Sequence, residues 1–158
     1  MRKNKFLIFY LSLLLVLNSC GFQLRKPLDV NYQSYAIVGD SSGLSKLVHK
    51  KLSFADIKEN KHGNADLTIE ITNNNFSKRI LSLAGNGQVG EFELIQSIEY
   101  RFKTNGEWSL PRKLEAIREY TYDPTLYNAA RAEEGYLKDS MLEQLSRSLI
   151  TEINNLGK

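Results

Sequence analysis

Residues 35 to 158 predict a single α+β domain, in which two helices pack on one face of a mostly antiparallel four-stranded sheet. Three observations predict this fold. Apolar and polar residues alternate between Phe92 and Phe102, which is typical of a strand with one buried face. Apolar residues recur every four positions from Leu137 to Ile153, as on the buried stripe of a helix. Asn105-Gly106 is the dipeptide that most strongly indicates a tight hairpin. The expected element order is β-α-β-β-β-α.

The first two elements are a strand and a helix. Tyr35 to Val38 form a short apolar run that ends at Gly39-Asp40. Ser41 or Ser42 can cap the helix that follows. Its apolar residues have helical spacing: Leu44, Leu47, Val48 and Leu52. The polar stretch 58–64 then predicts a loop.

Three strands should come next and form an antiparallel meander. Residues 67–72 alternate apolar and polar side chains, and Asn86-Gly87 marks a turn after them. In the strand at 92–102 the alternation is interrupted at Ile95-Gln96. The hairpin turn then leads to a strand from about residue 113 to residue 122.

The last element is a long helix that opens at Asp123-Pro124. Asp123 is a suitable cap, and Pro124 fits a first turn because its missing N–H has no partner there. Tyr136, Leu142 and Leu156 should widen the apolar stripe. The opposite side is expected to carry polar residues: Lys138, Asp139, Glu143 and Arg147.

The N-terminus has the three parts of a bacterial lipoprotein signal. Basic residues at positions 2, 3 and 5 precede an apolar run of 12 residues, 6–17. This run suits a signal peptide and is shorter than the roughly 20 residues of a membrane-spanning helix. Leu17-Asn18-Ser19-Cys20 resembles the lipobox, although Asn18 is an unusual residue there. We therefore expect 1–19 to be removed; the alternatives are an ordinary secretory signal and an uncleaved anchor.

Cys20 is the chain's single cysteine, so lipidation would account for a thiol without a disulfide partner. Acyl chains such as palmitate would hold the protein at a membrane. The polar residues 20–34 would form the lipidated N-terminus and its tether. Because Gly21 replaces the Asp that retains lipoproteins at the inner membrane of enteric bacteria, we expect the periplasmic side of the outer membrane.

Charge and motifs argue against several classes of function. The chain has 21 Lys and Arg and 18 Asp and Glu, and three basic residues leave with the signal peptide. The mature chain is then balanced, which disfavours nucleic-acid binding. His49 and His62 lack metal-ligand spacing, and no GxSxG motif is present. The sequence predicts neither an enzyme nor a bound cofactor.

Several short motifs resemble one family. Cys20-Gly21-Phe22-Gln23-Leu24-Arg25 resembles the start of the LPS-assembly lipoproteins of the LptE family. Gly85-Asn86-Gly87-Gln88, with Glu91-Phe92 after it, is similar to the family's Asn-Gly-Gln turn and strand. Tyr122-Asp123-Pro124 and the stretch 129–134 resemble its last helix. The matches span nearly the whole mature chain.

This resemblance implies a role in lipopolysaccharide export. Members of the family sit as a plug inside the large outer-membrane barrel LptD, help it to fold, and bind lipopolysaccharide. The expected partners are therefore LptD, lipopolysaccharide and the membrane that holds the N-terminal lipid. A different function stays open, namely a stand-alone periplasmic binding lipoprotein or a pilotin for another outer-membrane complex.

Candidate residues for lipopolysaccharide binding are basic, because the ligand carries phosphates. They are Lys78, Arg79 and Arg131. Arg131 falls where the family has a basic residue implicated in lipopolysaccharide contact; alternatively, it pairs with Glu134 on the helix surface. The family's second implicated basic residue corresponds to Gly85, so Lys78 or Arg79 would have to replace it.

A barrel interface would need exposed apolar and aromatic anchors. The candidates are Leu81, Leu83, Tyr120, Tyr122 and Tyr127. The alternative for these five residues is that they complete the core or pack the start of the last helix.

Overall fold

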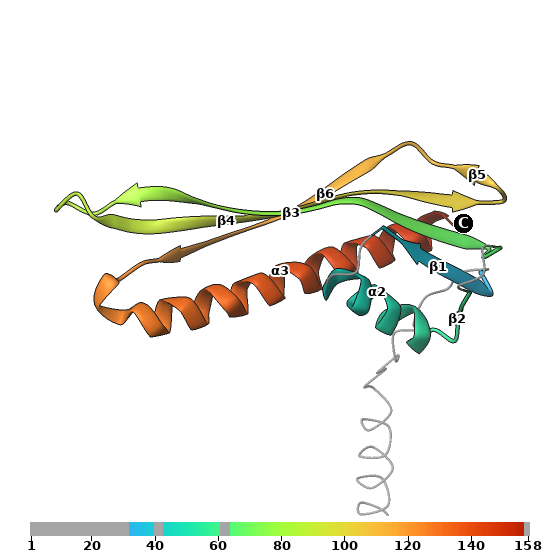
Figure 1. Ribbon diagram of the computed structural model, residues 1–158, viewed down its shortest axis with the longest axis horizontal. Helices are drawn as coiled ribbons and strands as arrows, with labels where there is room; N and C mark the ends of the chain where they lie inside the picture. Colours follow the sequence, from blue (N-terminus) through green and yellow to red (C-terminus); the bar gives the residue numbers. More distant parts are fainter. Residues whose placement is uncertain (1–31, 40–42, 61–63, 157–158) are drawn as a thin grey trace, which may run out of the picture.

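The computed structural model describes residues 32–39, 43–60 and 64–156, which form two layers. Both helices lie on one face of a mixed sheet, and no helix of the described residues covers the other face (Figure 1). The predicted α+β class is confirmed. The elements are β1 (Ser34–Val38), α2 (Gly43–Phe54), β2 (Lys58–Glu59), β3 (Leu67–Leu83), β4 (Val89–Thr104), β5 (Glu107–Trp108), β6 (Arg112–Thr121), the 3-10 turn η1 (Pro124–Leu126) and α3 (Tyr127–Leu156).

The sheet contains the predicted meander, since β4 pairs antiparallel with β3 on one side and with β6 on the other. β1 pairs parallel to β3. Two strands of two residues each bring the total to six: β2 beside β1 and β5 beside β4. The stretch 58–64, expected as a loop, therefore begins with a short strand.

β3 is the main departure from the prediction. It was expected at 67–72 but continues to Leu83 and stays paired with β4 along its length. Irregularities between Ile71 and Asn73 and between Ile80 and Ser82 interrupt the register. The β3–β4 hairpin reaches beyond the start of α3 and forms one end of the molecule (Figure 1).

Both predicted turns are present. Asn105 and Gly106 have φ of 53° and 84°, as a two-residue hairpin with positive φ at both positions requires. Gly87 has φ of 79°, and the Asn86 side chain accepts a hydrogen bond from the Gln88 amide at 3.1 Å. These turns fix the register on both sides of β4.

The core lies between the sheet and the helices. Fully buried side chains include Tyr35, Leu44, Leu52, Leu67, Ile69, Leu94, Ile98, Tyr100, Met141, Leu145 and Leu149. The alternation of β4 continues through its centre, because Gln96 is buried at 6% exposure and bonds Asn74 at 2.5 Å. Tyr136 does not join the stripe and is 73% exposed.

The last helix begins as the sequence predicts. Asp123 accepts a hydrogen bond from the Thr125 amide at 2.8 Å, and Pro124 opens the turn η1 that leads into α3. Glu143, expected on the solvent side, instead binds Lys51 of α2 at 2.6 Å. No helix within the described ranges combines the length and the apolarity needed to cross a membrane.

Some expectations fall outside the described residues. They are the signal peptide 1–19, the lipidation of Cys20, most of the tether 20–34 and the cap at Ser41 or Ser42. They stay predictions.

Candidate anion-binding cavity

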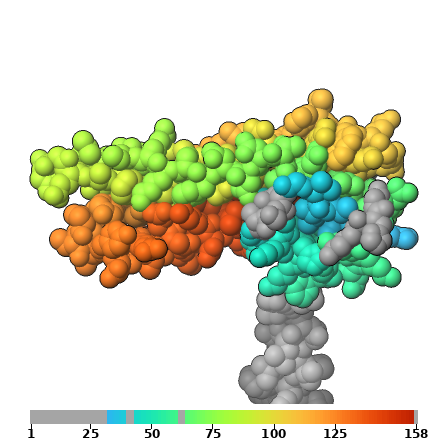
Figure 2. Space-filling model, viewed as in Figure 1, coloured from blue at the N-terminus to red at the C-terminus, as the bar shows by residue number. Residues whose placement is uncertain are grey.

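A cavity of about 770 Å³ lies where the start of α3 faces β4 and β6 and the far half of β3. Figure 2 shows this end of the molecule as two stacked layers, with the β3–β4 hairpin over the first turns of α3. The cavity is lined by aromatic and charged side chains: Lys78, Phe92, Tyr120, Tyr122, Tyr127, Arg131, Glu134 and Lys138. Side chains from four elements, β3, β4, β6 and α3, thus build one site.

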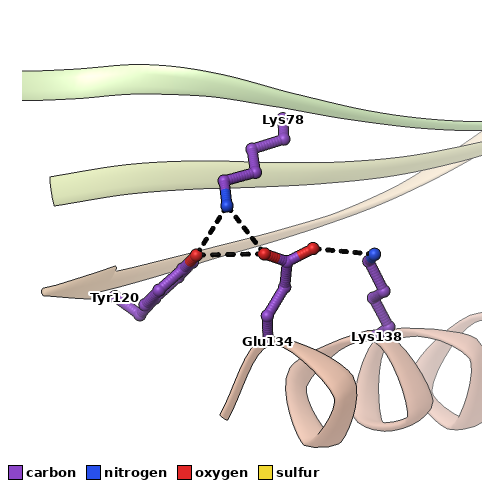
Figure 3. A network of polar contacts seen from close by, with 4 residues as sticks. All are labelled: Lys78, Tyr120, Glu134 and Lys138. Carbon is purple, nitrogen blue, oxygen red and sulfur yellow. Dashed lines mark hydrogen bonds and ion pairs between the residues drawn. The ribbon is translucent and has the colours of Figure 1, made fainter. Parts of the chain in front are cut away.

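A polar network joins the two layers across this cavity (Figure 3). Lys78 Nζ donates to Glu134 Oε2 at 2.7 Å and to the Tyr120 hydroxyl at 2.8 Å. The Tyr120 hydroxyl donates to the same carboxylate oxygen at 3.1 Å. Lys138 Nζ lies 2.7 Å from the other oxygen, Oε1. Both oxygens of Glu134 are therefore engaged by lysines.

Aromatic rings hold the two ammonium groups in place. Lys78 Nζ lies 3.9 Å from the centre of the Phe92 ring, and Lys138 Nζ lies 4.2 Å from that of Phe76. Such cation–π contacts are favourable when the cation is partly desolvated. Phe92 in turn packs edge-on against Tyr122, with ring centres 5.2 Å apart. The lysines are positioned by both charge and ring contacts.

The ion pair between Lys78 and Glu134 is charged on both sides at neutral pH. Hydrogen bonds from Lys138 and then Lys78 lower the pKa of Glu134 to about 2, against the opposing effect of burial. Burial works to lower the pKa of Lys78, but its bonds to Glu134 and Tyr120 outweigh it and raise that pKa. Lys78 and Glu134 therefore both carry charge in this arrangement.

Arg131 stands on the rim of this cavity. It is exposed, and among the described residues it has neither an ion pair nor a hydrogen bond. The surface pairing with Glu134 that the sequence left open is not formed, because Lys78 and Lys138 occupy that carboxylate. Arg131 thus has an unused planar donor group beside two lysines.

The structure brings Lys78 and Arg131 together but leaves Arg79 elsewhere. Successive strand residues point to opposite faces, so Arg79 lies on the face of the sheet away from the helices. There its Nε donates to Glu93 at 2.6 Å, and Glu93 is only 6% exposed. Arg79 is therefore not at the cavity.

The proposed interface residues fall into two groups. Leu81, Leu83 and Tyr127 are 40%, 63% and 58% exposed, so they are available for contact. Tyr120 is 5% exposed and Tyr122 packs against the core. The positions of these two tyrosines agree with the alternative to barrel contact, in which they pack against the start of the last helix.

Among the charged and aromatic residues of the cavity, Phe92, Glu134 and Lys138 are not singled out by the sequence. Phe92 was predicted as a core residue, while Glu134 and Lys138 were placed on a helix surface. The available signal was the spacing of Arg131, Glu134 and Lys138, which puts all three on one side of the helix. Nothing in the local sequence indicates that Lys78, 56 positions before Glu134, completes this site.

Fold and cavity together define a small α+β domain whose cavity is lined by basic and aromatic side chains. Within the described ranges, no three His, Cys, Asp or Glu side chains are placed to hold a metal ion.

Comparison with known proteins identifies the family. The family model for LptE, described as lipopolysaccharide-assembly, matches residues 26–153. The chain belongs to the LptE family.

Relatives and solved structures agree with this assignment. The LPS-assembly lipoprotein LptE of Pectobacterium atrosepticum is 23% identical over 159 residues, covering 97% of this chain and 86% of that protein. The rare lipoprotein B of Shewanella oneidensis has a TM-score of 0.66 at 25% identity, covering 79% of this chain and 98% of that one. An uncharacterized lipoprotein B of Nitrosomonas europaea has the same fold, with a TM-score of 0.72 at 22% identity, covering 86% and 92%.

Proposed function

We propose that this chain is a non-enzymatic outer-membrane lipoprotein that binds lipopolysaccharide during its delivery to the cell surface. In this role it plugs the export barrel LptD and assists the assembly of that barrel. Membership of the LptE family supports the general role in lipopolysaccharide assembly. The observation that carries the proposal is the cavity in which Lys78, Lys138 and Arg131 converge beside aromatic rings.

The cavity matches the chemistry of a phosphorylated glycolipid. Arginine binds a phosphate group through two parallel hydrogen bonds, and lysine adds a point charge. Exposed apolar side chains lie on the neighbouring elements, with Ile80 of β3 at 55% and Leu126 of η1, just before α3, at 59%. An acyl chain could therefore rest on this apolar edge while the phosphate enters the cavity.

Contact with the barrel is proposed for the projecting hairpin and the start of α3. Leu81, Leu83 and Tyr127 are the exposed members of the predicted interface. Exposed apolar residues grouped at one end of a domain are typical of a partner site. The lipid on Cys20 would hold this domain at the inner surface of the outer membrane.

The binding proposal is tested by reversing the charge of Arg131. We expect Arg131→Glu to weaken lipopolysaccharide binding about tenfold or more, because a charge-assisted hydrogen bond contributes ~1.5–3 kcal/mol. Binding of labelled lipopolysaccharide to the purified domain measures this. The matched control is Arg147→Glu, which makes the same charge change on the exposed side of α3 away from the cavity. Equal losses in both variants, or no loss in either, would reject Arg131 as a contact.

The second function differs in its consequence for the cell. A stand-alone binding lipoprotein or pilotin for another complex predicts normal lipopolysaccharide export after depletion of this protein. The proposed function predicts lipopolysaccharide retained inside the cell. Surface labelling of lipopolysaccharide after depletion separates the two.

A further inference from the structure

Glu134 is the one acidic side chain among four charged residues that line the cavity. It lies between Lys78 and Lys138 and uses both carboxylate oxygens to bind them (Figure 3). A site for an anion thus already contains an anion. Glu134 would therefore compete with a bound phosphate group for Lys78 and Lys138.

We propose that Glu134 is an internal counter-anion of this cavity, which an incoming phosphate group displaces from Lys78 and Lys138. The inference rests on the proposed function, because it describes how a lipopolysaccharide phosphate gains the lysines. Glu134 keeps the two ammonium groups gathered and neutralised while the cavity is empty. A ligand binds by exchanging one set of charge-assisted hydrogen bonds for another.

Accessibility supports this exchange. The side chains of Lys78 and Lys138 are 30% and 40% exposed, so a ligand can reach both from the solvent. Arg131 adds a donor group that Glu134 does not occupy. A phosphate can therefore bind Arg131 first and then compete for the lysines at short range.

Charge explains why a phosphate group can succeed in this competition. A phosphomonoester carries close to two negative charges and three acceptor oxygens near neutral pH, whereas the carboxylate of Glu134 has one charge and two oxygens. Among the described residues, three basic side chains and one acidic side chain line the cavity, so a dianion balances their formal charge and a monoanion does not. The pKa of Glu134, about 2, means that protonation does not free the lysines at physiological pH. Displacement has to come from the ligand.

The test removes the competing charge without changing the shape of the side chain. We expect Glu134→Gln to tighten binding of phosphorylated lipopolysaccharide by roughly three- to tenfold, since two partly exposed ion pairs no longer compete. Lipopolysaccharide whose lipid A phosphates have been removed enzymatically should show no such gain. The matched control is Glu133→Gln, which removes the same charge from an exposed neighbour that lines no part of the cavity. Its effect on binding should be under twofold.

Three results would overturn the inference while leaving the proposed function intact. Glu134→Gln could weaken binding, which would make Glu134 a support for the lysines. The gain could be the same for dephosphorylated lipid, or the same in Glu133→Gln, which would make it an effect of net charge. If wild-type protein binds no lipopolysaccharide at all, the proposed function itself fails.

A measurement on the unmutated protein covers the case in which Glu134→Gln does not fold. The carboxyl carbon resonance of Glu134 should shift when N-acetylglucosamine 1-phosphate, which has no ammonium group, fills the cavity, because the carboxylate loses its lysine partners. A resonance that stays unchanged once neighbouring cavity resonances have shifted would contradict the displacement.

Discussion

At the scale of single residues, position on a strand decides which basic side chains reach the cavity. Lys78 and Arg79 are neighbours in sequence. Lys78 forms an ion pair with Glu134 on the face of the sheet that the helices cover, whereas Arg79 forms an ion pair with Glu93 on the other face. The two were equal candidates because residues 73–83 were not predicted as a strand. Without a strand there was no alternation to separate them.

The ionised state of Glu134 gives a pH prediction. Its pKa in the folded protein is about 2, below the usual value of 4.5, so folding favours its charged form. This contribution to stability is fully present above the unfolded pKa and is lost as pH falls from about 4.5 towards 2. The difference in unfolding free energy between wild type and Glu134→Gln should therefore be constant above pH 5 and shrink below it. Urea titrations at several pH values measure this. A difference independent of pH would show that the ion pairs add no stability.

At the scale of elements, the sequence predicts the strands and helices that have a regular hydrophobic period, and it does not predict those whose period is interrupted or too short. β4 and α3 have long, regular patterns and were found close to their real bounds. The far half of β3 begins with three asparagines, which disfavour strands, and register irregularities disturb its alternation. β2 and β5 have two residues each, too few for any period to appear.

Two glycines provide a contrast at this scale. Gly39, after β1, has φ of 95°, and a Cβ there would lie 2.3 Å from the carbonyl oxygen of Ile71. Gly39→Ala should therefore lower the free energy of unfolding by about 2 kcal/mol or more. Gly135 lies in α3, and among the described residues no heavy atom beyond its chain neighbours and the adjacent helix backbone lies within 4 Å of such a Cβ. Gly135→Ala should raise stability by about 0.5–1 kcal/mol, since alanine favours a helix. Urea unfolding compares the two, and similar effects would contradict the backbone argument.

At the scale of the whole molecule, the fold separates two tasks along its length. The half that contains α2 carries much of the core, while the end where the β3–β4 hairpin lies over the first turns of α3 carries the cavity and exposed apolar residues (Figure 1). The sequence predicted the layers because each element has one apolar face. It predicted Lys78 and Arg131 as site residues separately. These two residues are 53 positions apart, on a strand and on a helix. They line the same cavity only because the tertiary structure places β3 over the start of α3.

The central claim is that this domain works as the lipopolysaccharide-binding partner of the export barrel. The most direct measurement is purification of a tagged, full-length copy from outer membranes, followed by identification of what accompanies it. We expect one large outer-membrane barrel protein, LptD, to be recovered with it in equal amount. Wild-type protein recovered alone, or with a different outer-membrane complex, would contradict it.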